Sequence, residues 1–491
     1  MSSESTSRQH GPAPALILTG LILFALFLRA WRLGDWGFEA TEMFTLRDSN
    51  NPKLGNPRPL IYFLNYFLIR SWRPLDELGL RLFPALFGVL AVPAVYLVGR
   101  RLLGTRAALF TAFLIAVSSF HVYYSQFARY WSLVFLLSAI YPYAIYVGVR
   151  ERNREALFVG FITGALAILA HPVSTLLVGG LGLWLMATYL RRDHMAWLWG
   201  QRAARWGLLA FVIVALVLAV RYIPMLQDWI TVRTQPKGGQ FLLHLPGGPG
   251  LKQLAVLLSY ADTLTLPVVL AGVVGIVLLW QQGERSLALL LTCLLVFPVA
   301  FLILVSFFAA ISTMYLLPTS PVLFYGAGVF LDRIAKVDLG LRPRWLVPVT
   351  VTALIVIGGV PTLISQYRDG RRYGFKAMAS WLNERLEPGD VVFSDQHQVM
   401  QYYLKTVPVQ RLVGDPAPLM TAMDSGKRAL WVVAPAPSHA FRTNPKLGKL
   451  KSWIQGRCQL RNTLGSGRLD FRQHYLEIYR CPPALPVATS P

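Results

Sequence analysis

Long apolar runs, most of them free of charged side chains, alternate with short basic segments along most of the chain. Such runs match the roughly 20 apolar residues that an α-helix needs to cross a lipid bilayer. We therefore expect a mainly α-helical protein, a polytopic transmembrane bundle. The pattern predicts eleven spans, at residues 14–30, 81–99, 107–121, 131–149, 156–171, 173–190, 206–222, 263–281, 287–311, 315–331 and 345–365.

Composition supports this prediction. Hydrophobic residues make up 54% of the 491 residues and charged residues only 14%, well below the roughly 25% of soluble domains. The net charge of +23 does not indicate a nucleic-acid-binding surface, because most Lys and Arg lie in short loops between apolar runs. The charge therefore bears on membrane topology.

Basic residues favour every second loop, which orients the spans. With a cytoplasmic N-terminus, the short outer loops around 122–130, 171–173 and 312–314 hold only Arg129, whereas the inner loops are rich in arginine, as at Arg100, Arg101, Arg106, Arg150, Arg152 and Arg154. Residues 1–13 are then a flexible cytoplasmic tail and 14–365 the transmembrane domain. Its long outer loops are 31–80 and 222–262.

Residues 366–491 have the composition of a soluble domain, which an odd number of spans places in the periplasm. A helix is predicted at 375–386 and strands at 391–393, 429–434 and 474–479, which together indicate a small α/β domain. Cys458 and Cys481 both fall in it. In an oxidising periplasm they can form a disulfide, and the alternative is two half-buried free thiols.

Carboxylates are scarce, and two of them stand out in the first outer loop. Glu39 and Glu42 are three residues apart, a spacing that puts both on one face of a helix beside the membrane surface. Such a pair can act as a general base or hold a divalent cation. The alternative is the solvated face of an interfacial helix.

Several segments in this half of the chain resemble a known family. Pro57-Arg58-Pro59-Leu60 follows the acidic segment, and Tyr124-Ser125-Gln126-Phe127-Ala128-Arg129 is the most specific match. The series resembles the type C membrane glycosyltransferases that use polyprenyl-phosphate-linked sugars, near the bacterial protein O-mannosyltransferases and aminoarabinose transferases. Three positions depart from the family. Thr41 stands where the family's Asp-Glu pair has its first acid, and Pro57 stands where the Pro-rich turn has its His. Phe127 stands where the Tyr-Ser-Gln-Glu-Ala-Arg segment has its acid. No cofactor is therefore certain, and a divalent cation stays an open possibility.

The resemblance implies transfer of a sugar from a polyprenyl-phosphate donor to a glycan, lipid or protein acceptor, on the periplasmic face of a bacterial inner membrane. Glu39 and Glu42 are the candidate catalytic bases, and cations must hold the donor phosphate. The candidates for that role are Arg129, then Arg58, Arg233 and Lys237. Further candidates for substrate contact are Tyr124, Gln126 and His171.

Two of these residues also allow a role that does not involve the substrate. Arg129 can extend to lipid headgroups, and His171 can cap a helix. Two other functions are also open. A flippase or exporter of lipid-linked saccharide predicts charged residues inside the spans or internal repeats, and neither is evident. A non-catalytic relative is suggested by the substituted motif positions.

Overall fold

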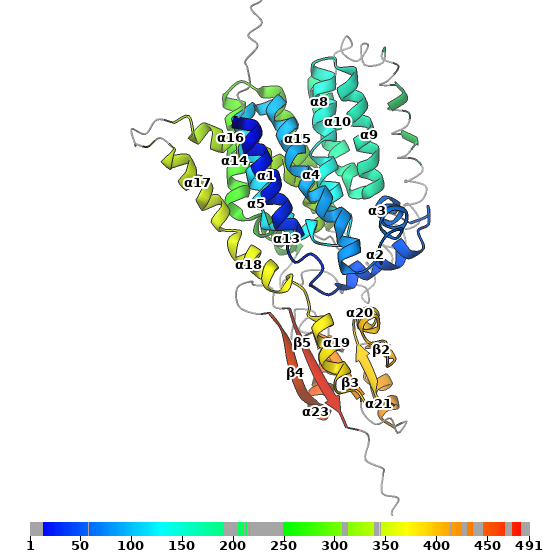
Figure 1. Cartoon of the computed structure of the whole chain (residues 1–491). Coiled ribbons are helices and arrows are strands. Elements are labelled where there is room, and N and C mark those ends of the chain that lie inside the picture. The colour runs from blue at the N-terminus through cyan, green and yellow to red at the C-terminus, as the bar shows by residue number, and fades with distance from the viewer. Residues whose placement is uncertain are drawn as a thin grey trace, which may run out of the picture.

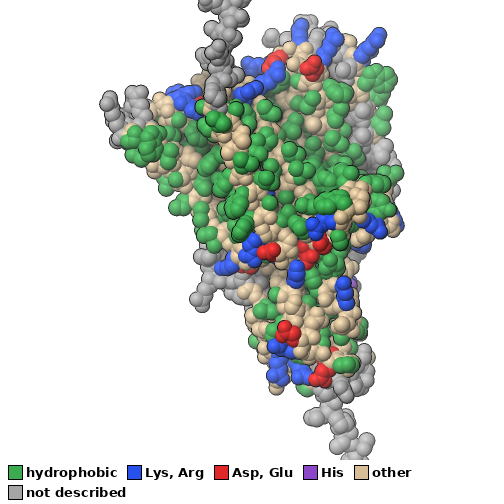
Figure 2. Space-filling model, in the orientation of Figure 1, with side chains coloured by type: hydrophobic (Ala, Val, Ile, Leu, Met, Phe, Trp, Pro, Cys, Tyr) green, Lys and Arg blue, Asp and Glu red, His purple; other side chains and the backbone are tan. Residues whose placement is uncertain are grey.

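The computed structural model consists of a helical bundle with a smaller α/β domain at one end (Figure 1). On the face in view, a broad area of hydrophobic side chains covers the bundle, and charged side chains gather at its far end and at the junction with the smaller domain (Figure 2). This distribution is that of a membrane-spanning protein. The structure describes residues 13–56, 58–189, 249–306, 313–337, 345–412, 415–424, 430–435, 445–466 and 474–482, with isolated positions at 200, 202, 205–207, 209, 212–213, 216 and 343.

Most helices of the bundle follow the predicted apolar runs, whereas α13 (Pro249–Leu264) lies almost wholly within the predicted second outer loop. The helices are α1 (Ala13–Ala30), α4 (Glu77–Leu103), α5 (Thr105–Val117), α6 (Ser119–Ser125), α7 (Trp131–Ser138), α8 (Tyr141–Arg150), α9 (Arg154–Ala170), α10 (Thr175–Tyr189), α13, α14 (Leu266–Gln281), α15 (Arg285–Ser306), α16 (Ser320–Ile334), α17 (Leu346–Ile357) and α18 (Val360–Asp369). The 3-10 helices η2 (Pro172–Ser174) and η3 (Thr313–Thr319) precede α10 and α16.

Judged by the length of its helices, the structure has fewer membrane spans than the sequence predicts. Within the described residues, five helices are long and apolar enough to cross a membrane, or up to eight if each bent pair is one span. The predicted span at 206–222 lies largely outside the described residues. Helices α9 and α10 have 17 and 15 residues, near the lower limit for crossing a bilayer. Eleven spans therefore stays a prediction.

One bend brings the third predicted span to the outer loop. Helices α5 and α6 meet at 59°, because Ser118 between them has an extended backbone. Its side chain then caps α6 by accepting a hydrogen bond from His121 N at 3.3 Å. The chain after α6, residues 126–130, consequently turns beside the first outer loop.

The first outer loop is itself largely helical. It contains α2 (Ala40–Asn50), α3 (Pro59–Leu64) and the π-helix η1 (Asn65–Ile69). Asp76 ends the loop as the N-cap of α4, accepting a hydrogen bond from Gly79 N at 2.7 Å. Arg81, one turn into α4, therefore lies beside the loop.

The C-terminal domain confirms the predicted helix and three predicted strands and adds two strands. Its sheet has the order β2-β1-β3-β5-β4, with β1 parallel to β2 and β3, and β5 antiparallel to β3 and β4. A disulfide joins Cys458, just before β4, to Cys481 at the end of β5. The elements are α19 (Phe375–Asn383), β1 (Val391–Ser394), α20 (His397–Tyr403), β2 (Val409–Arg411), α21 (Ala417–Asp424), β3 (Leu430–Pro435), α23 (Pro445–Arg457), β4 (Gln459–Ser466) and β5 (His474–Cys481).

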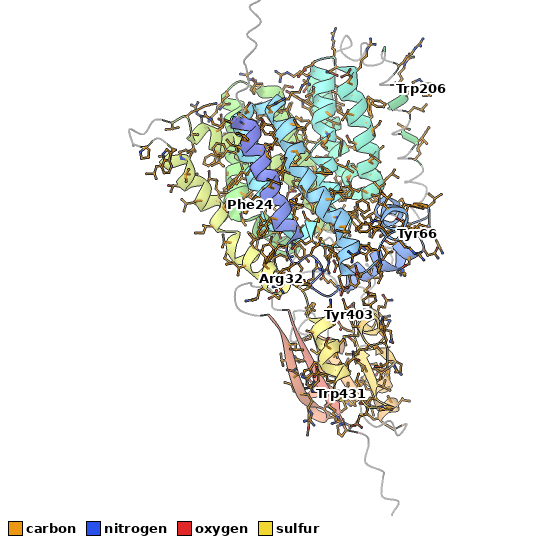
Figure 3. The ribbon with its side chains drawn as sticks, in the orientation of Figure 1. Phe24, Arg32, Tyr66, Trp206, Tyr403 and Trp431 are labelled. Carbon is orange, nitrogen blue, oxygen red and sulfur yellow. A yellow bond between two sulfur atoms is a disulfide. The ribbon has the colours of Figure 1, made fainter. Side chains whose placement is uncertain are left out.

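Polar contacts tie this domain to the first outer loop. Tyr403 Oη accepts a hydrogen bond from Phe38 N at 2.7 Å and donates one to Glu77 Oε1 at 2.9 Å. Arg32 donates from Nη1 to the carbonyl of Tyr367, at the end of α18, at 2.6 Å. Figure 3 shows Arg32 and Tyr403 at this junction, which is where the charged site lies.

Candidate active site

Two groups of charged and polar side chains lie around α2. The carboxylate group consists of Glu39, Glu42, Arg81 and Arg372, and the cation cluster consists of Arg58, Arg129 and His171. The first outer loop, the segment after α6 and the linker before α19 supply most of these residues. Residues from distant parts of the sequence thus converge at the end of the bundle that faces the C-terminal domain.

Glu42 is the centre of the carboxylate group and is fully buried. Its Oε1 accepts hydrogen bonds from Arg81 Nε at 3.1 Å and Ala128 N at 2.7 Å. Its Oε2 accepts from Arg81 Nη2 at 2.9 Å, Arg372 Nη1 at 3.0 Å and Glu39 N at 2.9 Å. Both oxygens are therefore occupied, and Glu42 is not on a solvated helix face.

The charge on Glu42 is stabilised by its neighbours. Burial acts to raise its pKa, but the positive charges of Arg372 and Arg81 and the hydrogen bonds outweigh burial and lower the pKa below its ordinary 4.5. A general base needs an accessible oxygen and a pKa near the working pH. Glu42 has neither, so its contacts favour a structural role.

Glu39 is less buried than Glu42, and its pKa is shifted in the opposite direction. It is the N-cap residue of α2 and is half-buried. Tyr123 Oη, from α6, donates a hydrogen bond to Glu39 Oε2 at 3.5 Å. Burial is the largest influence on the pKa of Glu39 and raises it, while Arg372 is the largest opposing influence. A raised pKa in a glutamate that is only half-buried suits a general base.

The carboxylate group does not fit a divalent cation. A metal bound by Glu39 and Glu42 would have to displace the Arg81 and Arg372 guanidinium groups from the Glu42 oxygens. In the part of the chain that the structure describes, no group of three His, Cys, Asp or Glu side chains is placed to hold a metal ion. These side chains form an ion-pair network with one another and do not form a set of metal ligands.

The cation cluster surrounds the ring of Tyr130. The guanidinium carbons of Arg129 and Arg58 lie 4.8 and 4.9 Å from the centre of that ring. Arg129 is only 6% exposed, so it points into the protein and not toward headgroups. It donates hydrogen bonds to Thr41 O at 3.0 Å and Thr45 Oγ1 at 3.3 Å.

Positive charge in this cluster is not neutralised within the described residues. No described carboxylate forms an ion pair with Arg129 or Arg58, and the buried Nε of Arg58 has no hydrogen-bond partner there. Buried cations are costly unless an anion accompanies them. The cluster is therefore suited to bind an anion such as a phosphate.

His171 completes the cluster and also caps a helix turn. Its Nδ1 accepts a hydrogen bond from Val173 N at 3.0 Å, so the proton of the neutral ring lies on Nε2. Within the described chain Nε2 is buried and has no partner. Burial and the charges of Arg58 and Arg129 hold the pKa of His171 well below its usual range. A neutral N–H donor therefore adjoins the two cations.

The other predicted residues have different surroundings. The Gln126 amide donates to the carbonyls of Leu28, Arg29 and Trp31 and accepts from Gln366, so it links α1 to α18 and is not directed at a substrate. Tyr124 is buried among aromatic rings. Two further candidates, Arg233 and Lys237, lie outside the described residues.

Sequence reasoning missed three residues of the site. Arg81, Tyr123 and Arg372 were not predicted as site residues and lie far from Glu42 along the chain, although Arg81 and Tyr123 fall in segments that resemble the family. The available signal for Arg81 was a lone arginine at the start of an apolar run, where its charge must find a partner. For Arg372, 330 residues from Glu42, there was none.

The fold is that of a helical membrane protein with a small C-terminal α/β domain. Residues 62–223 match the family model of the dolichyl-phosphate-mannose-protein mannosyltransferases. No curated protein sequence matches the chain significantly.

Solved structures with a similar fold cover most of the chain. ArnT from Cupriavidus metallidurans bound to undecaprenyl phosphate is similar with a TM-score of 0.58 and 15% identity, over 96% of this chain and 98% of that one. The archaeal oligosaccharyltransferase AglB from Archaeoglobus fulgidus, in complex with an inhibitory peptide and a dolichol-phosphate, is similar with a TM-score of 0.54 and 13% identity, over 86% of this chain and 69% of that one. These matches confirm the predicted family resemblance and fold class.

Proposed function

We propose that the protein is an integral-membrane glycosyltransferase that moves a sugar from a polyprenyl-phosphate donor to a glycan, lipid or protein acceptor. The observation that carries this proposal is the cation cluster, whose two arginines have no described carboxylate partner. An anion is needed to balance them, and the phosphate of a lipid-linked sugar is one that also belongs at a membrane surface.

In the reaction, the acceptor hydroxyl oxygen attacks the anomeric carbon of the sugar. The bond from that carbon to the phosphate oxygen breaks, and its electron pair leaves with the polyprenyl phosphate. Arg129 and Arg58 stabilise the charge that develops on this phosphate, and His171 Nε2–H is a further donor. The positions of these donors do not depend on which sugar is carried.

Glu39 is the residue that removes the acceptor proton. Glu39 is half-buried, whereas Glu42 is fully buried and both of its oxygens are occupied by hydrogen bonds from the protein. Only the ionised form of Glu39 is a base, so activity is expected to rise with pH as Glu39 loses its proton. Because burial raises the pKa of Glu39, this rise lies above the usual range of a glutamate.

The similar structures support this donor class, since one is bound to undecaprenyl phosphate and another to a dolichol-phosphate. We place the protein in a bacterial inner membrane with a cytoplasmic N-terminus and the C-terminal domain in the periplasm. The disulfide between Cys458 and Cys481 supports an oxidising compartment for that domain.

A transfer assay tests the proposal. The purified protein is incubated with a panel of undecaprenyl-phosphate-linked sugars and an envelope extract as acceptor, and released undecaprenyl phosphate is measured by mass spectrometry. One or more donors should be consumed by the wild type, and Glu39→Gln should reduce the rate about 10²- to 10⁴-fold. Transport of an intact lipid-linked sugar without release of undecaprenyl phosphate would instead indicate a flippase.

A further inference from the structure

The linker between the bundle and the C-terminal domain inserts a cation into the carboxylate group. Arg372 lies between α18 and α19 and is only 3% exposed. Its Nη1 forms the 3.0 Å ion pair with Glu42, and its Nη2 donates to the carbonyl of Gln126 at 2.8 Å. The guanidinium carbon lies 5.3 Å from the ring centre of Phe127. Arg372 therefore joins three parts of the chain.

The backbone before Arg372 is held in an uncommon conformation. Gly370 has φ +71°, and a Cβ added there would lie 2.5 Å from Cγ of Trp36 in the first outer loop. Arg371 has φ +52°, a left-handed backbone conformation that residues other than glycine seldom adopt. This close turn against the loop directs Arg372 inward, and the Arg372 contacts offset its cost.

We propose that Arg372 is a positioning residue of the active site, which holds Glu42 and the 126–127 backbone in place and supplies the positive charge that faces Glu39. The inference rests on the proposed function, because it concerns the base of that reaction. It means that the C-terminal domain is anchored through a residue on which the chemistry depends.

The charged groups around Glu39 explain why this role belongs to Arg372 and not to Arg81. Glu39 interacts with Arg372 from the linker, Glu42 from α2, Tyr123 from α6 and Arg81 from α4. Arg81 cannot replace Arg372, because its N–H groups are committed to Glu42 and to the carbonyls of residues 33, 36 and 37.

Loss of the Arg372 charge leaves Glu39 beside the negative charge of Glu42. The proton is then held more tightly, so a higher pH is needed to form the base. An opposite charge at this range shifts a carboxyl pKa by about one to three pH units. The acid limb of the pH–rate profile should therefore move to higher pH.

The experiment measures the transfer rate against pH for Arg372→Met, Arg372→Lys and the wild type. We expect the acid-limb midpoint of Arg372→Met to rise by about one pH unit or more, with most activity recovered at high pH. Arg372→Lys keeps the charge and should keep the midpoint. Arg368→Gln removes an exposed cation just before the same linker and is the matched control, with an unchanged profile.

An Arg372→Met rate that falls equally at every pH, with the midpoint unshifted, overturns the inference. If Arg372→Met does not fold, Arg372→Met combined with Glu42→Gln removes both members of the buried pair and is compared with Glu42→Gln alone. The combined variant should have its midpoint about one unit higher, and equal midpoints overturn the inference. A wild type that consumes no donor and does not bind undecaprenyl phosphate overturns the proposed function instead.

Discussion

Substituting the two glutamates of the first outer loop one at a time separates their roles. Glu42→Gln keeps the size of the side chain but removes the charge that faces Arg81 and Arg372. It also replaces one acceptor oxygen by an NH₂ group that points at N–H donors. The structure therefore predicts that this variant loses stability, whereas Glu39→Gln loses activity.

The size of the effect follows from the burial of the ion pairs. Arg81 and Arg372 have side chains that are 0% and 1% exposed, so neither guanidinium can turn to water when Glu42 is neutral. Removing one partner of a buried pair costs about 3–5 kcal/mol. That corresponds to a change in the folding equilibrium of roughly two to three and a half orders of magnitude.

Thermal unfolding in detergent, followed by tryptophan fluorescence, measures this loss. Glu42→Gln should unfold at a clearly lower temperature than the wild type, and Glu39→Gln within a degree or two of it. The difference between wild type and Glu42→Gln should shrink as the pH falls below about 4.5. A lowered folded-state pKa stabilises the protein above the unfolded-state pKa, and this contribution is lost as the pH falls through the folded-state pKa.

The opposite pattern would refute the reasoning. If Glu42→Gln unfolds like the wild type and abolishes transfer, then Glu42 is the base and its ion pairs open during the reaction. If Glu39→Gln retains full activity, Glu39 is not the base.

Three further predictions concern other parts of the molecule. Arg129→Gln should weaken binding of undecaprenyl phosphate roughly 10- to 100-fold, measured by native mass spectrometry, because a hydrogen bond to a charged group contributes about 1.5–3 kcal/mol; unchanged binding would remove Arg129 from the phosphate site. Gly370→Ala should lower the unfolding temperature, since an added Cβ meets Trp36 and the φ of +71° is unfavourable for alanine; an unchanged temperature would contradict the close approach. Cys458 and Cys481 should resist alkylation until a reductant is added, and Cys458→Ser should cost about 3 kcal/mol for a loop with a sequence separation of 23; labelling of both thiols without reductant would contradict the disulfide.

The helical bundle was largely predictable because crossing a bilayer is a local property of a run of side chains. The runs at 81–99 and 131–149 became α4 and the pair α7–α8 with small changes at their ends. The bend at Ser118 was not predicted, because the apolar run continues through this residue and gives no sign of its extended backbone.

In the C-terminal sheet, too, some elements were predictable from the sequence and others were not. Strands β1, β3 and β5 are rich in buried apolar residues and were predicted. Strand β2 has only three residues, and β4 is a polar edge strand whose pairing with β5 shifts register between Leu460 and Asn462. Neither pattern differs enough from a loop to be recognised before its partner strand is known.

The sequence by itself determined that this is a multi-span membrane protein and that its scarce acids include a pair at Glu39 and Glu42. It also indicated Arg129 and Arg58 as cations for a phosphate. Only the tertiary structure decided that one acid is enclosed by Arg81 and Arg372 while the other is partly accessible. The physical reason is that burial and ion pairing depend on residues brought together from distant parts of the chain, and these two effects set the ionisation of a carboxyl group.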